Sequence, residues 1–91
     1  MEKQWVWVVE KIEEYDGAVD TKIKIFKNKE DAIKQKEEWK EKDYFFINDV
    51  KSDIDNECYD SRIDDDELYF YAYDSFNFDS LTIDIREMEV L

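Results

Sequence analysis

The sequence predicts an α+β fold in which a small antiparallel sheet of four to five strands carries one amphipathic helix on a face. Two observations support this prediction. A stretch of alternating residues near each end of the chain is typical of a β-hairpin, and a stretch with helical composition lies between them. The expected element order is ββα(β)ββ. The chain has 91 residues and is 43% hydrophobic, which suits one acidic domain over residues 1–91.

The first expected element is an N-terminal hairpin over residues 4–27. Its first strand places Trp5, Trp7 and Val9 on one parity, as expected for side chains that share a face. Asp16 and Gly17 then form a typical two-residue hairpin turn. Lysine and isoleucine alternate in the stretch that follows, which predicts a half-exposed second strand.

A helix is expected over residues 29–42. Asn28 is a suitable N-cap, and acidic residues follow it in the first turn, where they favour the helix dipole. The apolar positions of this stretch fall on one narrow stripe that includes Ala32 and Trp39. We expect this stripe to dock the helix on the sheet, with Trp39 as its anchor.

The second half of the chain has weaker patterns. Residues 44–47 are a short aromatic run that fits a third strand or a packed loop. Residues 48–66 have no clear period and predict a long acidic loop. Residues 67–90 contain two alternating stretches, which predict a C-terminal hairpin.

The formal net charge of −13 is concentrated after the expected helix. Residues 1–42 carry ten lysines against eleven acids, whereas residues 43–91 carry fifteen acids against one lysine and two arginines. A negative field repels nucleic acid and anionic lipid, and it attracts basic surfaces. We therefore expect a basic protein partner, with nucleic-acid-binding proteins as the candidate class, and no direct binding of nucleic acid or membrane. The oligomeric state stays open.

The composition disfavours catalysis. The chain has no histidine, and its only cysteine, Cys58, lies among carboxylates that favour the neutral thiol. Asp53, Asp55, Glu57 and Asp64 imitate ligand positions of a calcium-binding loop, but Cys58 stands where the sharp turn needs glycine. We expect no enzyme, no cofactor and no metal site. The lone cysteine and the lack of a long apolar stretch predict a cytoplasmic protein.

Three tyrosines, Tyr69, Tyr71 and Tyr73, lie on one face of an expected strand. They either pack under the helix, form cross-strand pairs, or belong to a protein interface, where tyrosine beside acids suits an arginine-rich partner. Carboxylates at positions i and i+2 of a strand are roughly 6.6 Å apart, about two phosphate steps of roughly 3.4 Å along one DNA strand. The leading hypothesis is therefore a small acidic inhibitor that mimics nucleic-acid charge and blocks a basic nucleic-acid-binding protein. The alternative is an intracellular interaction or structural module whose acidity serves solubility.

In size and composition the chain resembles small acidic phage-encoded counter-defence proteins, such as anti-restriction and anti-CRISPR inhibitors. They are similarly short, poor in glycine and proline, and rich in Asp, Glu, Tyr and Phe. The resemblance implies an inhibitory role and transfers no functional residue. Mimicry requires the acids to share one continuous face, whereas scattered acids favour the alternative. The expected partner-binding residues are Asp53, Asp55, Glu57, Asp60, Asp64, Asp65, Asp66, Glu67, Tyr69, Tyr71, Tyr73, Asp74 and Asp79.

Overall fold

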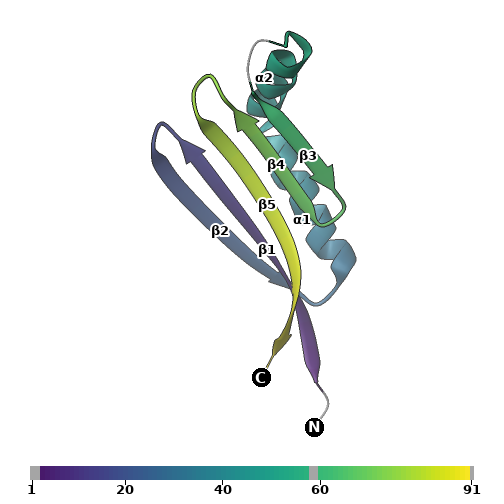
Figure 1. The fold of residues 1–91 in the computed structure, drawn as a ribbon. Helices are drawn as coiled ribbons and strands as arrows, with labels where there is room; N and C mark the ends of the chain where they lie inside the picture. Colours follow the sequence, from purple (N-terminus) through teal and green to yellow (C-terminus); the bar gives the residue numbers. More distant parts are fainter. Residues whose placement is uncertain (1–2, 58–59, 91) are drawn as a thin grey trace.

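A computed structural model describes residues 3–57 and 60–90, which form an antiparallel sheet with two helices on one face (Figure 1). The elements in chain order are β1 (Gln4–Tyr15), β2 (Ala18–Phe26), α1 (Lys29–Lys42), α2 (Tyr44–Asp55), β3 (Arg62–Asp66), β4 (Tyr69–Asp74) and β5 (Asp79–Val90). The five strands have the spatial order β2-β1-β5-β4-β3, so β1 and β5 join the two halves of the sheet. This architecture confirms the α+β prediction. The described residues form an elongated body of 55 × 24 × 19 Å.

The N-terminal hairpin and the first helix lie where the sequence predicts them. Tyr15 pairs with Ala18 across a two-residue turn. Asp16 and Gly17 have φ angles of 52° and 80°, which is the combination of a type I′ turn. This turn matches the right-handed twist of paired strands, so the Asp-Gly signal sets the register of the whole ladder.

The hydrophobic core lies between the sheet and the helices. Val9 of β1, Phe70 of β4 and Leu81 of β5 are almost completely buried on this side of the sheet. Trp39 of α1 is only 2% exposed and belongs to the same cluster, which confirms its role as the anchor of the helix.

Two expectations for the middle of the chain are wrong. Residues 44–47 are neither a strand nor a loop but begin α2, and the acidic loop expected over 48–66 is replaced by the rest of α2 and by β3. Ile47 and Val50, three positions apart, are buried and place one face of α2 against β3 and β4. Tertiary burial therefore overrides the weak helix propensity of this Asp-rich and Ser-rich stretch. The expectation for Cys58 lies outside the described residues.

The two faces of the sheet differ in what covers them. In each ladder the paired residues advance one for one, so side chains of one parity on each strand share a face. Both helices pack on one face, and we call the opposite face, which is toward the viewer in Figure 1, the open face. In the described part of the chain, no helix is long and apolar enough to cross a bilayer.

Candidate protein-binding face

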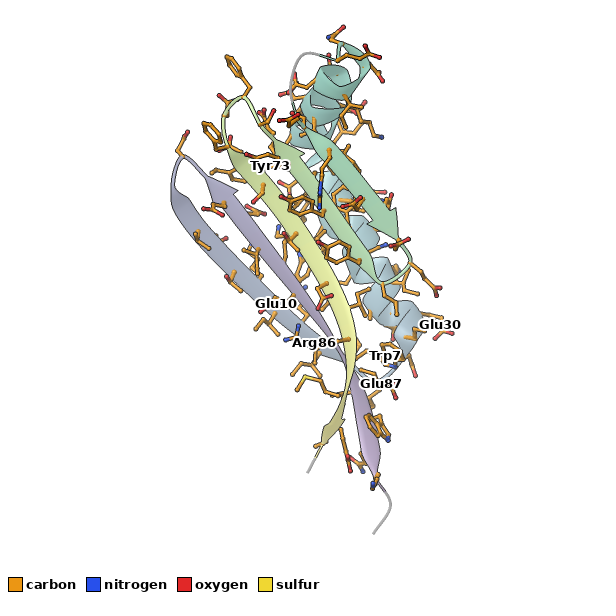
Figure 2. The ribbon with its side chains drawn as sticks, in the orientation of Figure 1. Trp7, Glu10, Glu30, Tyr73, Arg86 and Glu87 are labelled. Atoms are coloured by element: carbon orange, nitrogen blue, oxygen red, sulfur yellow. The ribbon has the colours of Figure 1, made fainter. Side chains whose placement is uncertain are left out.

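The open face carries tyrosines, carboxylates, arginines and aliphatic side chains (Figure 2). Its charged members in the five strands are five carboxylates and two arginines, which leaves a formal balance of −3. These charged residues are Glu10, Glu14, Arg62, Asp64, Asp66, Asp84 and Arg86. Three of the acids, Asp64, Asp66 and Asp84, are cross-strand partners of the tyrosines, and the aliphatic residues lie mainly on β1 and β2.

Tyr69, Tyr71 and Tyr73 form a row along β4 on the open face, and each is half-buried. The rings of Tyr71 and Tyr73 are stacked, with centroids 6.4 Å apart. Phe70 and Ala72, which have the other parity, fill the core beneath the helices. The tyrosines therefore do not pack under the helix, which was one of the three possibilities.

Arg62 and Asp64, both on β3, lie beside Tyr71 of β4. The guanidinium carbon of Arg62 lies 5.2 Å from the centroid of the Tyr71 ring, and its Nη2 atom lies 3.3 Å from a carboxylate oxygen of Asp64. Asp64 is the cross-strand partner of Tyr71 in the β3–β4 ladder. Desolvation raises the pKa of the Tyr71 hydroxyl, and the nearby charge of Arg62 opposes this shift. One carboxylate and one aromatic ring on neighbouring strands thus hold an arginine.

A second cross-strand pair of aspartate and tyrosine lies two residues further along the β3–β4 ladder. Asp66 pairs with Tyr69, and Tyr69 in turn pairs with Asp84 of β5. Tyr69 therefore has a carboxylate on each side at the distance between neighbouring strands, roughly 4.8 Å. Of the described cations, none forms an ion pair with the Asp66 carboxylate, although Lys36 donates a hydrogen bond to the Asp66 backbone carbonyl from the other face.

A second arginine lies across the middle of the open face. Asp84 and Glu10 are directly opposite each other on β5 and β1, where two like charges destabilise a pair of strands. Arg86 lies beside both, with its Nη1 atom 3.0 Å from Asp84 and 3.6 Å from Glu10. Figure 2 labels Arg86 and Glu10 on this face. The arginine offsets the repulsion between the two acids.

The expected acids do not form one continuous face. Lys40 of α1 donates to Asp65 at 2.8 Å, and the buried Lys36 lies 3.8 Å from the same side chain. Lys29 pairs with Glu67 at 3.1 Å. The lysines of the first helix therefore neutralise these two acids on the helix side of the sheet.

Asp74 and Asp79 have structural roles at the turns. The buried Asp74 accepts hydrogen bonds from the backbone N–H of Phe76 and from the side chain of Asn77, which closes the turn between β4 and β5. Asp79 accepts a hydrogen bond from the backbone N–H of Asp16 and ties the two hairpin turns together. Asp74 is therefore buried in its turn, whereas Asp79 is half-buried and uses one carboxylate oxygen in this contact.

The remaining expected acids, Asp53, Asp55, Glu57 and Asp60, lie at the end of α2 and in the segment after it. Asp55, Glu57 and Asp60 are exposed. Desolvation and the nearby charge of Asp74 raise the pKa of the Asp53 carboxyl. In residues 3–57 and 60–90, no group of three or more Cys, Asp or Glu side chains is arranged to hold a metal ion.

Of the thirteen expected residues, the structure brings five together on the open face: Asp64, Asp66, Tyr69, Tyr71 and Tyr73. The expected binding residues did not include the other charged members of this face, which are Glu10, Glu14, Arg62, Asp84 and Arg86. One signal for Arg62 was available. Arg62, Asp64 and Asp66 are spaced by two, the period at which strand residues share a face.

Comparisons of the chain with protein-family models, with curated proteins and with solved structures find no match. The geometry of the open face therefore carries the functional argument.

Proposed function

We propose that this protein is a binding protein whose open face takes an arginine-bearing, basic surface of another protein and so blocks that surface. One observation carries the proposal. Arg62 lies over Tyr71 and pairs with Asp64, so this face already holds a guanidinium group between an aromatic ring and a carboxylate. Guanidinium groups stack on aromatic faces and pair with carboxylates in a way that ammonium groups reproduce less well.

The proposed contact for the partner is the row formed by Asp66, Tyr69 and Asp84. Asp66 and Tyr69 repeat the acid and ring that hold Arg62. Asp84 lies on the other side of the Tyr69 ring, where Arg86 already pairs with one of its carboxylate oxygens. Each such contact is weak at an exposed site, about 0.5 to 1 kcal/mol for the cation–π part. An interface of this kind therefore needs several arginines, and the net charge of −13 brings basic partners to it by long-range attraction.

Mimicry of nucleic-acid charge is the second candidate. Asp64 and Asp66 support it, because they lie two residues apart on the open face of β3, a spacing of roughly 6.6 Å. The dispersal of the other acids weakens it. Mimicry of phosphate charge predicts that lysine-rich and arginine-rich partners bind equally, whereas recognition by tyrosine and carboxylate favours arginine.

Titration of the protein with two peptides, nona-arginine and nona-lysine, tests the proposal. We expect nona-arginine to bind about 5-fold more tightly than nona-lysine, because each stacked guanidinium adds up to about 1 kcal/mol. Both affinities fall as salt rises, since the charges are exposed. Calorimetry at two salt concentrations measures both effects.

Variants locate the binding surface. We expect D66N to weaken nona-arginine binding about 3-fold, through the loss of one exposed carboxylate contact. The matched control is E38Q, which removes an acid from the exposed side of α1. Equal affinity for the two peptides, or equal effects of D66N and E38Q, would contradict the proposal and leave non-specific charge as the explanation.

A further inference from the structure

The strand β2 is an edge of the sheet with a free row of backbone groups. A type I′ turn closes with a hydrogen-bonded pair, here Tyr15 and Ala18, and such pairs then alternate along an antiparallel ladder. The even-numbered residues of β2 therefore bond to β1, and the backbone N–H and C=O groups of residues 19, 21, 23 and 25 point away from it. Of the described elements, Figure 1 shows none beside this outer edge.

The side chains of this edge are apolar on the open face. Val19, Ile23 and Ile25 are 63%, 54% and 64% exposed. The other edge strand of the sheet, β3, is only five residues long and rich in aspartate, two devices that prevent edge pairing. β2 has nine residues and three exposed aliphatic side chains. The two edges are thus unequal, and β2 is the one suited to pairing with another strand.

We propose that β2 pairs antiparallel with β2 of a second copy of this chain, so that two five-stranded sheets become one continuous ten-stranded sheet. The two-fold axis passes beside Lys22, so residues whose numbers sum to 44 lie opposite each other. This register places residues 19, 21, 23 and 25 of one copy opposite residues 25, 23, 21 and 19 of the other. It therefore joins the free backbone groups of both copies as hydrogen-bonded pairs.

The length of the overlap selects this register over its neighbours, because all nine residues of β2 then pair with the second copy. Asp20 of each copy lies opposite Lys24 of the other on the helix side, which favours a cross-strand ion pair at each of two sites. Within its own chain the Lys24 ammonium group also donates a hydrogen bond to Gln35 at 3.1 Å. Val19 lies opposite Ile25 on the open face, so exposed aliphatic side chains cover one another. A shift of two residues in either direction shortens the overlap. In one direction it places Lys22 opposite Lys24, and in the other it places Asp20 opposite Lys22.

Two features oppose the dimer and limit its strength. The Lys22 residues of the two copies lie opposite each other at the two-fold axis, and each chain carries a net charge of −13. The Lys22 side chains are exposed and can point apart, so their repulsion is small. Lys22 and Lys24 outnumber Asp20 on the helix side of β2, so the edge at which the copies meet carries no local excess of acid. We therefore expect a dimer whose dissociation depends on concentration.

Sedimentation equilibrium from about 5 μM to about 500 μM tests the proposal, over a range that spans moderate affinities. The expected result is a shift from the 11.2 kDa monomer to a species of twice that mass. A single 11.2 kDa species over the whole range would overturn the proposal. Oligomers that keep growing with concentration would also overturn it, because they indicate head-to-tail pairing of β2 with β3.

Charge exchange tests the register. K24D places two aspartates opposite each other at two sites, and we expect it to weaken the dimer about 10-fold. The double variant D20K/K24D restores the ion pairs with their signs reversed and should recover the dimer. The matched control K51D makes the same charge change on an exposed residue of α2 and should change dimerisation less. Failure of the double variant to recover the dimer would reject this register.

Ile23→Pro tests the edge itself. The backbone N–H of Ile23 points away from β1, so proline there removes an outward donor and leaves the bonds to β1 in place. We expect this variant to remain folded by circular dichroism and to sediment as a monomer. A folded I23P variant that still dimerises would contradict pairing through β2. The outcome is independent of the proposed function, because arginine-peptide binding uses β3, β4 and β5.

Discussion

The guanidinium carbon of Arg62 lies 5.2 Å from the centroid of the Tyr71 ring, which places one of the protein's own cations on its aromatic row. The same arginine pairs with Asp64 on its own strand. Arg62 therefore occupies a position that an arginine of a partner would otherwise take. If the open face binds arginine, Arg62 competes with the partner for Tyr71 and Asp64.

Replacement of Arg62 by glutamine should consequently increase affinity for nona-arginine, by about 3-fold. The substitution frees the Tyr71 ring and the Asp64 carboxylate for the peptide. Calorimetric titration of the variant measures the gain. The control K51Q removes one positive charge from α2, and an equal gain in K51Q would attribute the effect to net charge alone.

A second prediction concerns the ion cluster under the sheet. Lys11 is 3% exposed, and its ammonium group lies 2.5 Å from Glu13 and 3.7 Å from Asp43. K11M leaves two neighbouring carboxylates without their cation, so we expect it to lower the free energy of unfolding by about 3 kcal/mol. Urea denaturation measures the change. The exposed K22M variant serves as control, and a loss of equal size there would contradict the importance of the cluster.

The pH dependence of stability should report on Asp43. Desolvation and the nearby charge of Glu13 raise the pKa of the Asp43 carboxyl in the folded state. A raised carboxyl pKa favours the folded state at low pH, and this contribution is lost as pH rises through the folded-state pKa. The free energy of unfolding of D43N relative to wild type should therefore increase from about pH 4 to about pH 7. A difference between the two proteins that does not change with pH would contradict this assignment.

Replacement of Gly17 by a residue with a side chain should lower the stability of the protein. Its φ angle of +80° lies in the left-handed region, and an added Cβ would have nothing within 4 Å. The cost of G17A is therefore conformational rather than steric, and we expect about 1 kcal/mol of destabilisation. Thermal denaturation of wild type and G17A measures it. Unchanged stability would show that the turn accepts another conformation.

The parts of the fold that the sequence predicts correctly are those with strong local signals. The Asp16-Gly17 turn and the alternation on both sides of it define the first hairpin, and acids after Asn28 mark the start of α1. Neither Asn28 nor Asp43 makes a side-chain capping hydrogen bond. The first turn of α1 contains two acids, whereas the first turn of α2 has none. The spacing of Ile47, Val50 and Ile54 has the helical period and is the one clue to it.

The candidate site is harder to predict because it depends on pairing between distant strands. Alternation along β4 places Tyr69 and Tyr71 on one face, but it does not say which face the helices cover. Neighbouring acids in the sequence have different environments in the fold. Asp64 lies beside Arg62 on the open face, Asp65 pairs with a lysine of α1, and Asp74, at the end of β4, closes a turn. Only the strand order and register separate these roles.

The most direct test of the central claim is a two-dimensional NMR titration of the protein with nona-arginine, which reports where the peptide binds. The account predicts that amide shift changes concentrate on Asp66, Tyr69 and Asp84 and their neighbours on β3, β4 and β5. Shift changes centred on the exposed acids at the end of α2, or spread evenly over all acidic residues, would contradict it.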